Sequence, residues 1–263
     1  MPIDPNQFQT GGALQSAVAA SLLQYHDASA ELKLGDRIGP FRVVRELGRG
    51  GMAIVYLAER DDGEYQQRIA LKWMQGELSG AAGEALFRRE RQALADLRHP
   101  HIARLLDGGR TVSGRPWFAM EYIEGQPLDR HCFNQRLPQK ARLALFLQVC
   151  SAVAFAHAHG VLHRDIKPSN VLVDTDGSTR LLDFGIAQLL GDEDRLAPRA
   201  FTPGFASPEQ VAGEPLSAAS DVYQLGRLLA AIVSENEADF ATVLANAAVP
   251  TSGNVRPDGE LLP

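Results

Sequence analysis

Four polar residues of different types lie close together in the middle of the chain. Asp165, Lys167 and Asn170 fall within one short stretch, and Asp183 follows thirteen residues after Asn170. The Asp165 carboxylate is suited to accept or orient the proton of an attacking hydroxyl. The Lys167 ammonium can offset the charge of a transferred phosphoryl group. Asn170 and Asp183 supply oxygen ligands of the kind that Mg²⁺ takes beside nucleotide phosphates. The stretch therefore indicates phosphoryl transfer to a hydroxyl.

A glycine-rich turn lies upstream of this stretch. Gly48 and Gly50 stand between strands predicted at residues 41–47 and 53–58. Glycines at such a turn let backbone N–H groups approach phosphates closely. A dinucleotide fingerprint or a Walker loop should open a helix, and this turn does not. Taken alone, a glycine-rich hairpin is more often only a hairpin.

Lys72 ends an apolar run on a predicted strand. A lysine there is a candidate point charge for nucleotide phosphates when a carboxylate holds it; in isolation, a strand lysine is more often solvated. Glu90 is the candidate partner, because it lies in the middle of the helix predicted at residues 81–97. Glu84 and Asp96 are the alternatives.

Composition narrows the class of protein. The chain has 263 residues, of which 45% are hydrophobic and 22% charged, so a sizeable core can form. Its formal net charge of -6 argues against a nucleic-acid binder. Two cysteines, Cys132 and Cys150, are expected to be reduced thiols. With neither a signal pattern nor an apolar run of about 18 residues, we expect a cytoplasmic protein without membrane insertion.

The coarse pattern predicts three parts. Residues 1–33 read as a leader with one helix, residues 34–123 as a small lobe, and residues 124–263 as a larger helical lobe. The small lobe has one helix and five predicted strands, at residues 41–47, 53–58, 68–74, 102–106 and 117–122. In the larger lobe, helices are predicted at residues 140–159 and 219–233.

Together these motifs resemble the eukaryotic-type Ser/Thr protein kinases of bacteria. The resemblance covers about residues 34–233. It rests on the glycine-rich turn, Lys72, Glu90, the hinge Met120–Ile123, the catalytic loop His163–Asn170, Asp183-Phe184-Gly185, Ser207-Pro208-Glu209 and Asp221. It implies a two-lobed α+β fold in which a five-stranded antiparallel β lobe carries one helix. The larger, mainly helical lobe would be truncated after the helix that ends near Val233.

The resemblance also implies ligands. They are ATP with Mg²⁺, with Mn²⁺ as a second candidate metal. Asp165, Lys167, Asn170, Lys72 and Glu90 would be catalytic, and Asn170 and Asp183 would hold the metal. The ATP-binding residues would be Leu47, Gly48, Gly50, Val55, Ala70, Lys72, Met120, Glu121, Ile123 and Leu172. Of these, Val55, Ala70 and Leu172 should sandwich adenine.

A packed column of side chains should join the lobes in the active state. The resemblance implies that Leu94, Leu105, Phe184 and His163 form it, with Asp221 as its anchor.

On the acceptor side, the resemblance singles out Arg164, Thr202 and Glu209. Thr202 should contact the catalytic Asp and Lys, and Lys167 with Thr202 favours Ser or Thr acceptors over Tyr. Protein substrates are implied, and a partner protein could dock on the shortened lobe. The alternative function is a pseudokinase or scaffold that binds nucleotide and a partner. A small-molecule kinase is a further alternative, and a structural or nucleic-acid role has little support. His157, His159 and His163 are a candidate metal site.

Three features depart from the family pattern: Ala53 stands where the loop has its third glycine, the activation segment lacks its usual phosphosite, and the larger lobe is shortened after Val233. Residues 186–200 contain no Ser, Thr or Tyr, so the usual phosphate partner of Arg164 is missing. We hypothesise that Arg164 pairs with one of Asp192–Asp194 or with nothing, and that loop phosphorylation is not needed. Glu209 usually pairs with an arginine of a later helix, and Arg256 is the candidate here.

Overall fold

A computed structural model of the chain describes residues 31–51, 53–75, 80–184, 202 and 204–234, without the side chains of residues 80–83, 86 and 90. The described residues form two compact units. The first comprises residues 31–95 and 104–122, and the second comprises residues 96–103 and 123–234. The predicted leader lies outside the described residues.

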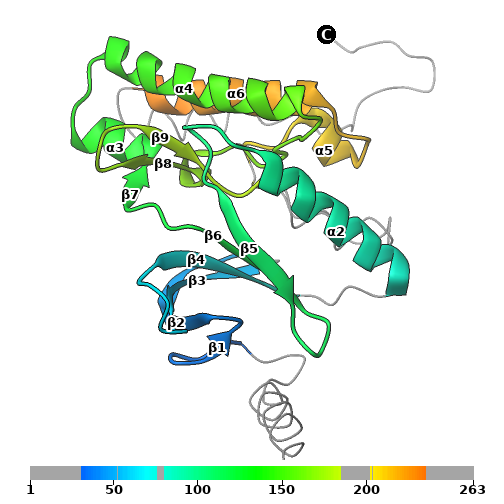
Figure 1. Ribbon diagram of the computed structural model, residues 1–263. Coiled ribbons are helices and arrows are strands. Elements are labelled where there is room, and N and C mark those ends of the chain that lie inside the picture. Colours follow the sequence, from blue (N-terminus) through cyan, green and yellow to red (C-terminus); the bar gives the residue numbers. More distant parts are fainter. Residues whose placement is uncertain (1–30, 52, 76–79, 185–201, 203, 235–263) are drawn as a thin grey trace, which may run out of the picture. The chain divides into compact units, whose positions relative to one another are not determined.

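The first unit is an antiparallel sheet with one helix, α2 (Gly80–Asp96), beside it (Figure 1). Among the described residues the strand order is β1-β2-β3-β4-β6-β5. The strands are β1 (Arg37–Ile38), β2 (Phe41–Arg49), β3 (Ala53–Arg60), β4 (Arg68–Met74), β5 (Leu105–Arg110) and β6 (Pro116–Glu121). The sheet has one strand more than the five predicted, because the two-residue β1 pairs with the start of β2.

One face of this sheet carries the core of the unit. Ile54 and Tyr56 on β3 alternate with residues of the opposite face, as side chains along a strand do. Leu71 and Trp73 on β4 join them, and all four are at most 2% exposed. On the helical side, Phe87 of α2 packs against Phe118 of β6, with ring centroids 5.1 Å apart.

The strand predicted at residues 102–106 is wrong in its bounds. β5 runs from Leu105 to Arg110 and includes Gly108 and Gly109, a residue type that is depleted in strands. The Trp117 ring explains the glycine, because a Cβ built on Gly109 would lie 3.0 Å from it. Ile102 instead forms a single parallel bridge with Leu181 in the second unit.

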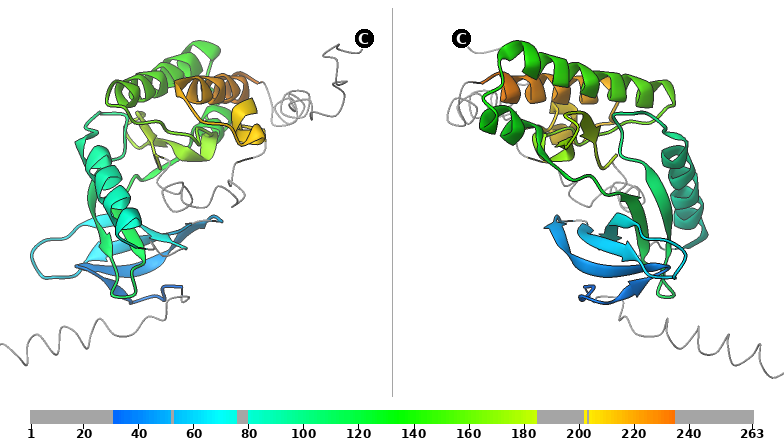
Figure 2. Two further views of the ribbon diagram at one scale, coloured as in Figure 1. Left: turned by 90° about the vertical axis from the view of Figure 1, so that its right-hand side faces the viewer. Right: turned by 60° about the vertical axis from the view of Figure 1, so that its left-hand side comes forward.

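The second unit combines a small sheet with helices. Its described elements are β7 (Gly125–Pro127), α3 (Leu128–Asn134), α4 (Gln139–Ala158), the 3-10 turn η1 (Pro168–Asn170), β8 (Val171–Asp174), β9 (Thr179–Leu181), α5 (Pro208–Ala212) and α6 (Ala218–Val233). Helices α4 and α6 lie side by side in every view (Figures 1 and 2). Arg142 of α4 joins their ends, because its Nη1 donates to the carbonyls of Ile232 at 2.8 Å and Ser234 at 3.0 Å.

Helix α4 is the central helix of this unit. By length and composition alone it could cross a membrane, and it is the one such helix among the described residues. Composition had predicted no stretch of that kind. The core helix of a soluble protein passes the same test. Leu145, Val149, Ala152, Val153 and Ala156 are the buried residues of α4, which contacts α6 and β9.

Residues 96–103 belong to the second unit, although the sequence assigned them to the small lobe. The Leu181 N–H donates to the His101 carbonyl at 2.8 Å, and the Ala103 N–H donates to the Leu181 carbonyl at 3.0 Å. The His99 ring lies 3.2 Å from the Ser151 hydroxyl of α4. These contacts attach the segment to β9 and α4.

Candidate active site

The buried carboxylate of Asp221 anchors the loop that begins at His163. Asp221 lies in the first turn of α6 and is 0% exposed. Its Oδ2 accepts the His163 N–H at 2.8 Å, and its Oδ1 accepts the Arg164 N–H at 2.7 Å. The His157 ring contacts Oδ2 at 2.7 Å. A buried carboxylate needs such donors, so the loop backbone and Asp221 hold each other in place.

The imidazole of His163 is neutral and fully buried. Burial lowers its pKa from the ordinary value. Its Nε2 lies 2.7 Å from the Leu182 carbonyl, and its Nδ1 accepts the Asp165 N–H at 3.3 Å, which is the pattern of an Nε2–H tautomer. The Phe184 ring lies 4.8 Å away. His163, Phe184 and Asp221 therefore meet as predicted. Leu94 and Leu105 lie in the first unit, so the rest of the column stays a prediction.

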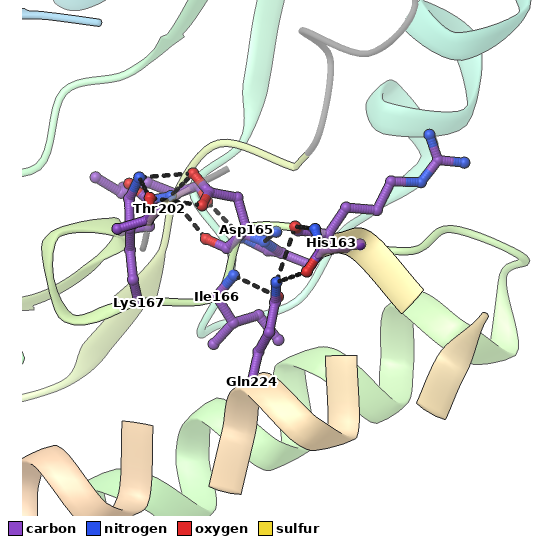
Figure 3. A network of polar contacts seen from close by, with 10 residues as sticks. His163, Asp165, Ile166, Lys167, Thr202 and Gln224 are labelled. Carbon is purple, nitrogen blue, oxygen red and sulfur yellow. Dashed lines mark hydrogen bonds and ion pairs between the residues drawn. The ribbon is translucent and has the colours of Figure 1, made fainter. Parts of the chain in front are cut away.

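Asp165, Lys167 and Thr202 form a closed polar triangle (Figure 3). Lys167 Nζ lies 2.8 Å from Asp165 Oδ2 and donates to the Thr202 hydroxyl at 2.7 Å. The Thr202 hydroxyl in turn donates to Asp165 Oδ1 at 3.2 Å. An aliphatic hydroxyl thus contacts a carboxylate and an ammonium at once. This is the environment that an acceptor hydroxyl would need in order to lose its proton.

Asn170 continues the network toward Asp183. Asn170 Nδ2 donates to the Asp165 carbonyl at 2.8 Å and to Asp165 Oδ2 at 3.0 Å. Both described hydrogen bonds of the Asn170 side chain therefore use Nδ2. Its Oδ1 is the atom suited to bind a metal. The Leu182 N–H donates to the Asn170 carbonyl at 2.8 Å, which brings the residue before Asp183 to Asn170.

A magnesium ion fits this donor set. Mg²⁺ takes one or two protein oxygens and completes its shell with phosphates and water, and Asn170 with Asp183 offers two. No group of three or more His, Cys, Asp or Glu side chains that could hold a metal occurs among the described residues. Each of the three histidines named as a candidate metal site makes another contact. The His157 ring contacts Asp221, the His159 ring contacts the Phe155 carbonyl, and the His163 ring contacts the Leu182 carbonyl.

In the first unit, four of the residues predicted to bind ATP share one face of the sheet. Val55 of β3 pairs with Lys72 of β4, and Ala70 of β4 pairs with Met120 of β6. Because alternate residues share a face, all four lie opposite the Ile54–Trp73 core. Lys72 is only 7% exposed, and a buried ammonium requires compensation. The side chain of Glu90, its predicted partner on α2, lies outside the described residues.

The glycine-rich turn has open space around it. A Cβ built on Gly48 meets nothing within 4 Å, and one on Gly50 meets only the Ala53 carbonyl, at 3.7 Å. Neither packing nor a positive φ therefore demands glycine at these two positions. Space kept free beside a backbone is what a phosphate would fill. Leu47, just before the turn, is 36% exposed.

The predicted hinge residues divide between the two units. The Glu121 N–H already donates to the Arg104 carbonyl at 2.9 Å, so this N–H is not available to a ligand. Ile123 and Leu172 belong to the second unit. Their predicted contacts with ATP, which need residues of both units, stay predictions.

On the acceptor side, the described partner of Glu209 is Ser220. The Ser220 hydroxyl donates to the Glu209 carboxylate, and this bond lowers the pKa of Glu209. Arg256, the predicted partner, lies outside the described residues. So do residues 192–194, the predicted partners of the Arg164 side chain.

Sequence reasoning missed two glutamines beside the loop, Gln210 and Gln224, which are 5% and 2% exposed. A signal for Gln224 was present. It stands three residues after Asp221 and four before Leu228, so it shares the buried face of α6. A polar residue on that face needs partners inside the unit.

The family model described as "Protein kinase domain" matches residues 41–242. A probable serine/threonine-protein kinase of Streptomyces coelicolor is 36% identical over 75% of this chain and 30% of its own length. The probable serine/threonine-protein kinase PknB of Lactococcus lactis is 31% identical over 83% and 36%. The crystal structure of the Mycobacterium tuberculosis PknI kinase domain, C20A mutant, matches with a TM-score of 0.61 and 30% identity, over 78% of this chain and 79% of that one. The chain spans about a third of the length of these curated relatives.

Proposed function

The chain belongs to the protein kinase family, and from this premise we propose that it transfers the γ-phosphoryl group of ATP to Ser or Thr hydroxyls of proteins. Relatives at 31–36% identity bear the name serine/threonine-protein kinase. The family uses ATP with a divalent metal, and we propose Mg²⁺ here. We also propose a cytoplasmic location and a role in bacterial signalling.

The triangle of Asp165, Lys167 and Thr202 carries this proposal. It places a hydroxyl 3.2 Å from the carboxylate that would orient an acceptor and 2.7 Å from an ammonium. Lys167 and Thr202, on which the resemblance rests its expectation of Ser or Thr acceptors, both contact Asp165, and this supports the proposal.

Each residue has a stated role in the proposal. Asp165 accepts or orients the proton of the acceptor hydroxyl. Lys167 stabilises charge on the transferred group. Lys72, with Glu90 as its proposed partner, positions the nucleotide phosphates. Asn170 and Asp183 would hold Mg²⁺, which, when bound, neutralises phosphate charge.

The direct test is transfer of label from [γ-³²P]ATP with Mg²⁺ to a generic protein substrate such as casein, followed by phosphoamino-acid analysis. We expect phosphoserine and phosphothreonine. The Asp165→Asn variant should lose most of the activity, because Asn cannot accept the proton. Asp176→Asn is the matched control, since Asp176 lies on the exposed turn between β8 and β9. Equal labelling by Asp165→Asn and the wild type would contradict the proposal.

The same samples distinguish the proposed kinase from the alternative function. A pseudokinase or scaffold would bind ATP·Mg²⁺, measured by calorimetry, without transferring label. Label on a small molecule instead of on casein would identify a small-molecule kinase. A partner protein that docks on the second unit stays part of the scaffold alternative.

A further inference from the structure

One buried side chain holds the backbone on both sides of Asp165. Gln224 Oε1 accepts the Ile166 N–H at 2.8 Å, and Gln224 Nε2 donates to the Arg164 carbonyl at 3.0 Å (Figure 3). These groups belong to the two peptide units that flank Asp165. The amide orientation follows from the contacts, because the Ile166 N–H can only donate.

A second glutamine extends this hydrogen-bond network toward the acceptor-side segment. Gln210 Nε2 also donates to the Arg164 carbonyl, at 2.8 Å, and its Oε1 accepts from Gln224 Nε2 at 2.7 Å. The same Oε1 accepts the Ser207 N–H at 2.9 Å. The two amides thereby connect the backbone of Asp165 to the first turn of α5, which follows Thr202 by a few residues.

Placing the polar Gln224 side chain inside the unit costs free energy, and a role for this side chain would explain why it is there. A buried amide is unfavourable unless its hydrogen bonds are made, and Gln224 occupies a face of α6 that Leu228 and Ile232 line with apolar side chains. Arg164 also has a φ of 69°, a left-handed conformation that an L-residue keeps only when its surroundings hold it. Gln224 supplies one of the bonds that hold this backbone.

We propose that Gln224 is a positioning residue for Asp165 and that Gln210 couples this position to the acceptor-side segment. The proposal rests on the proposed function, in which Asp165 orients the acceptor. Gln224 contacts backbone on either side of Asp165 but none of the residues assigned to ATP. Its loss should therefore reduce the rate of transfer and spare nucleotide binding.

The first variant is Gln224→Met, which keeps the shape of the side chain and removes its hydrogen bonds. Misplacing a catalytic group lowers the rate steeply, so we expect kcat to fall about 10- to 100-fold. The Kd for ATP should stay within about twofold, because no contact to the nucleotide is removed. Gln148→Met is the matched control. Gln148 Oε1 likewise accepts two bonds in the second unit, from the Thr179 N–H at 2.8 Å and its hydroxyl at 3.1 Å. It should lower thermal stability and leave kcat unchanged.

A second variant gives a readout that a purely structural role would not produce. Gln224→Glu retains an acceptor for Ile166 N–H but can donate to the Arg164 carbonyl only when protonated. Its kcat relative to that of the wild type should therefore rise as the pH falls. A pH-independent ratio would contradict the positioning role.

Amide hydrogen exchange makes the test independent of activity. In the wild type, the Ile166 amide should exchange slowly, and in Gln224→Met it should exchange faster while the Leu181 amide stays protected. An active wild type with unchanged kcat in Gln224→Met would overturn the positioning role alone. An inactive wild type would overturn the proposed function. Ile166 exchange would still decide whether Gln224 holds this backbone: faster exchange in Gln224→Met supports that role, and unchanged exchange refutes it.

Discussion

The carboxylate of Asp221 accepts the backbone N–H of His163 at 2.8 Å, deep inside the second unit. The two residues are 58 positions apart. This bond, with its companion to the Arg164 N–H, attaches the loop that carries Asp165 to the first turn of α6. The loop thus depends on a long-range contact rather than on its own local structure.

Replacing Asp221 by Asn should be strongly destabilising. The side-chain NH₂ would replace either Oδ1, where it would face the Arg164 N–H, or Oδ2, where it would face the His163 N–H and the His157 ring. In either orientation a buried backbone N–H would lose its acceptor. We expect the free energy of unfolding to fall by about 3 kcal/mol, measured by urea denaturation. Asp129→Asn, on the partly exposed start of α3, is the control. Similar losses for both variants would disprove the anchoring role.

The hydroxyl of Thr202 should matter more than its methyl group. Thr202→Val removes the contacts with Lys167 and Asp165, whereas Thr202→Ser keeps them. One or two charge-assisted bonds lost from the transition state correspond to a fall in kcat of about 10- to 100-fold. Steady-state assays with ATP and a protein substrate measure it. Equal rates for the Val and Ser variants would show that the triangle is not used.

The stability of the folded chain against urea should fall on mild acidification. Burial lowers the pKa of His99 and His163 below the ordinary value of 6.5. Below pH 6.5 the unfolded chain therefore binds protons that the folded chain resists, and stability present above that pH is lost as the pH falls. Urea midpoints between pH 8 and 5 measure this loss. His99 Nδ1 accepts the His101 N–H at 3.2 Å, so His99→Gln should flatten the profile. An unchanged slope would exclude His99 as a cause.

Two glycines should respond differently to substitution by alanine. A Cβ on Gly125 of β7 would lie 2.3 Å from the Val173 carbonyl oxygen, so Gly125→Ala should lower the free energy of unfolding by about 3 kcal/mol. A Cβ on Gly48 meets nothing within 4 Å, so Gly48→Ala should leave the melting temperature unchanged and weaken ATP binding. Thermal melts and ATP titrations of both variants provide the comparison. Unaltered ATP affinity in Gly48→Ala would argue against phosphates at this turn.

Local patterns predicted most elements closely. The helices at residues 81–97, 140–159 and 219–233 begin and end within one residue of α2, α4 and α6. Their apolar residues repeat at helical spacing, and that signal is local. The strand predicted at residues 102–106 missed the second half of β5, because Gly108 and Gly109 lack the side chains that mark a strand in sequence. The Trp117 ring explains Gly109, and the Arg91 side chain with the Trp117 carbonyl explains Gly108, so the reasons lie in neighbouring elements.

The sequence by itself determined which residue types the proposed chemistry can use. Asp165, Lys167 and Asn170 lie on one short loop, so their types and spacing place them together in any compatible fold. The tertiary structure decided what holds that loop. Thr202 meets Asp165 across 37 residues, and Gln224 meets Ile166 across 58. Hydrogen bonds over such separations leave no periodic trace in the sequence, because they depend on how α6 and the segment after Thr202 pack beside the loop.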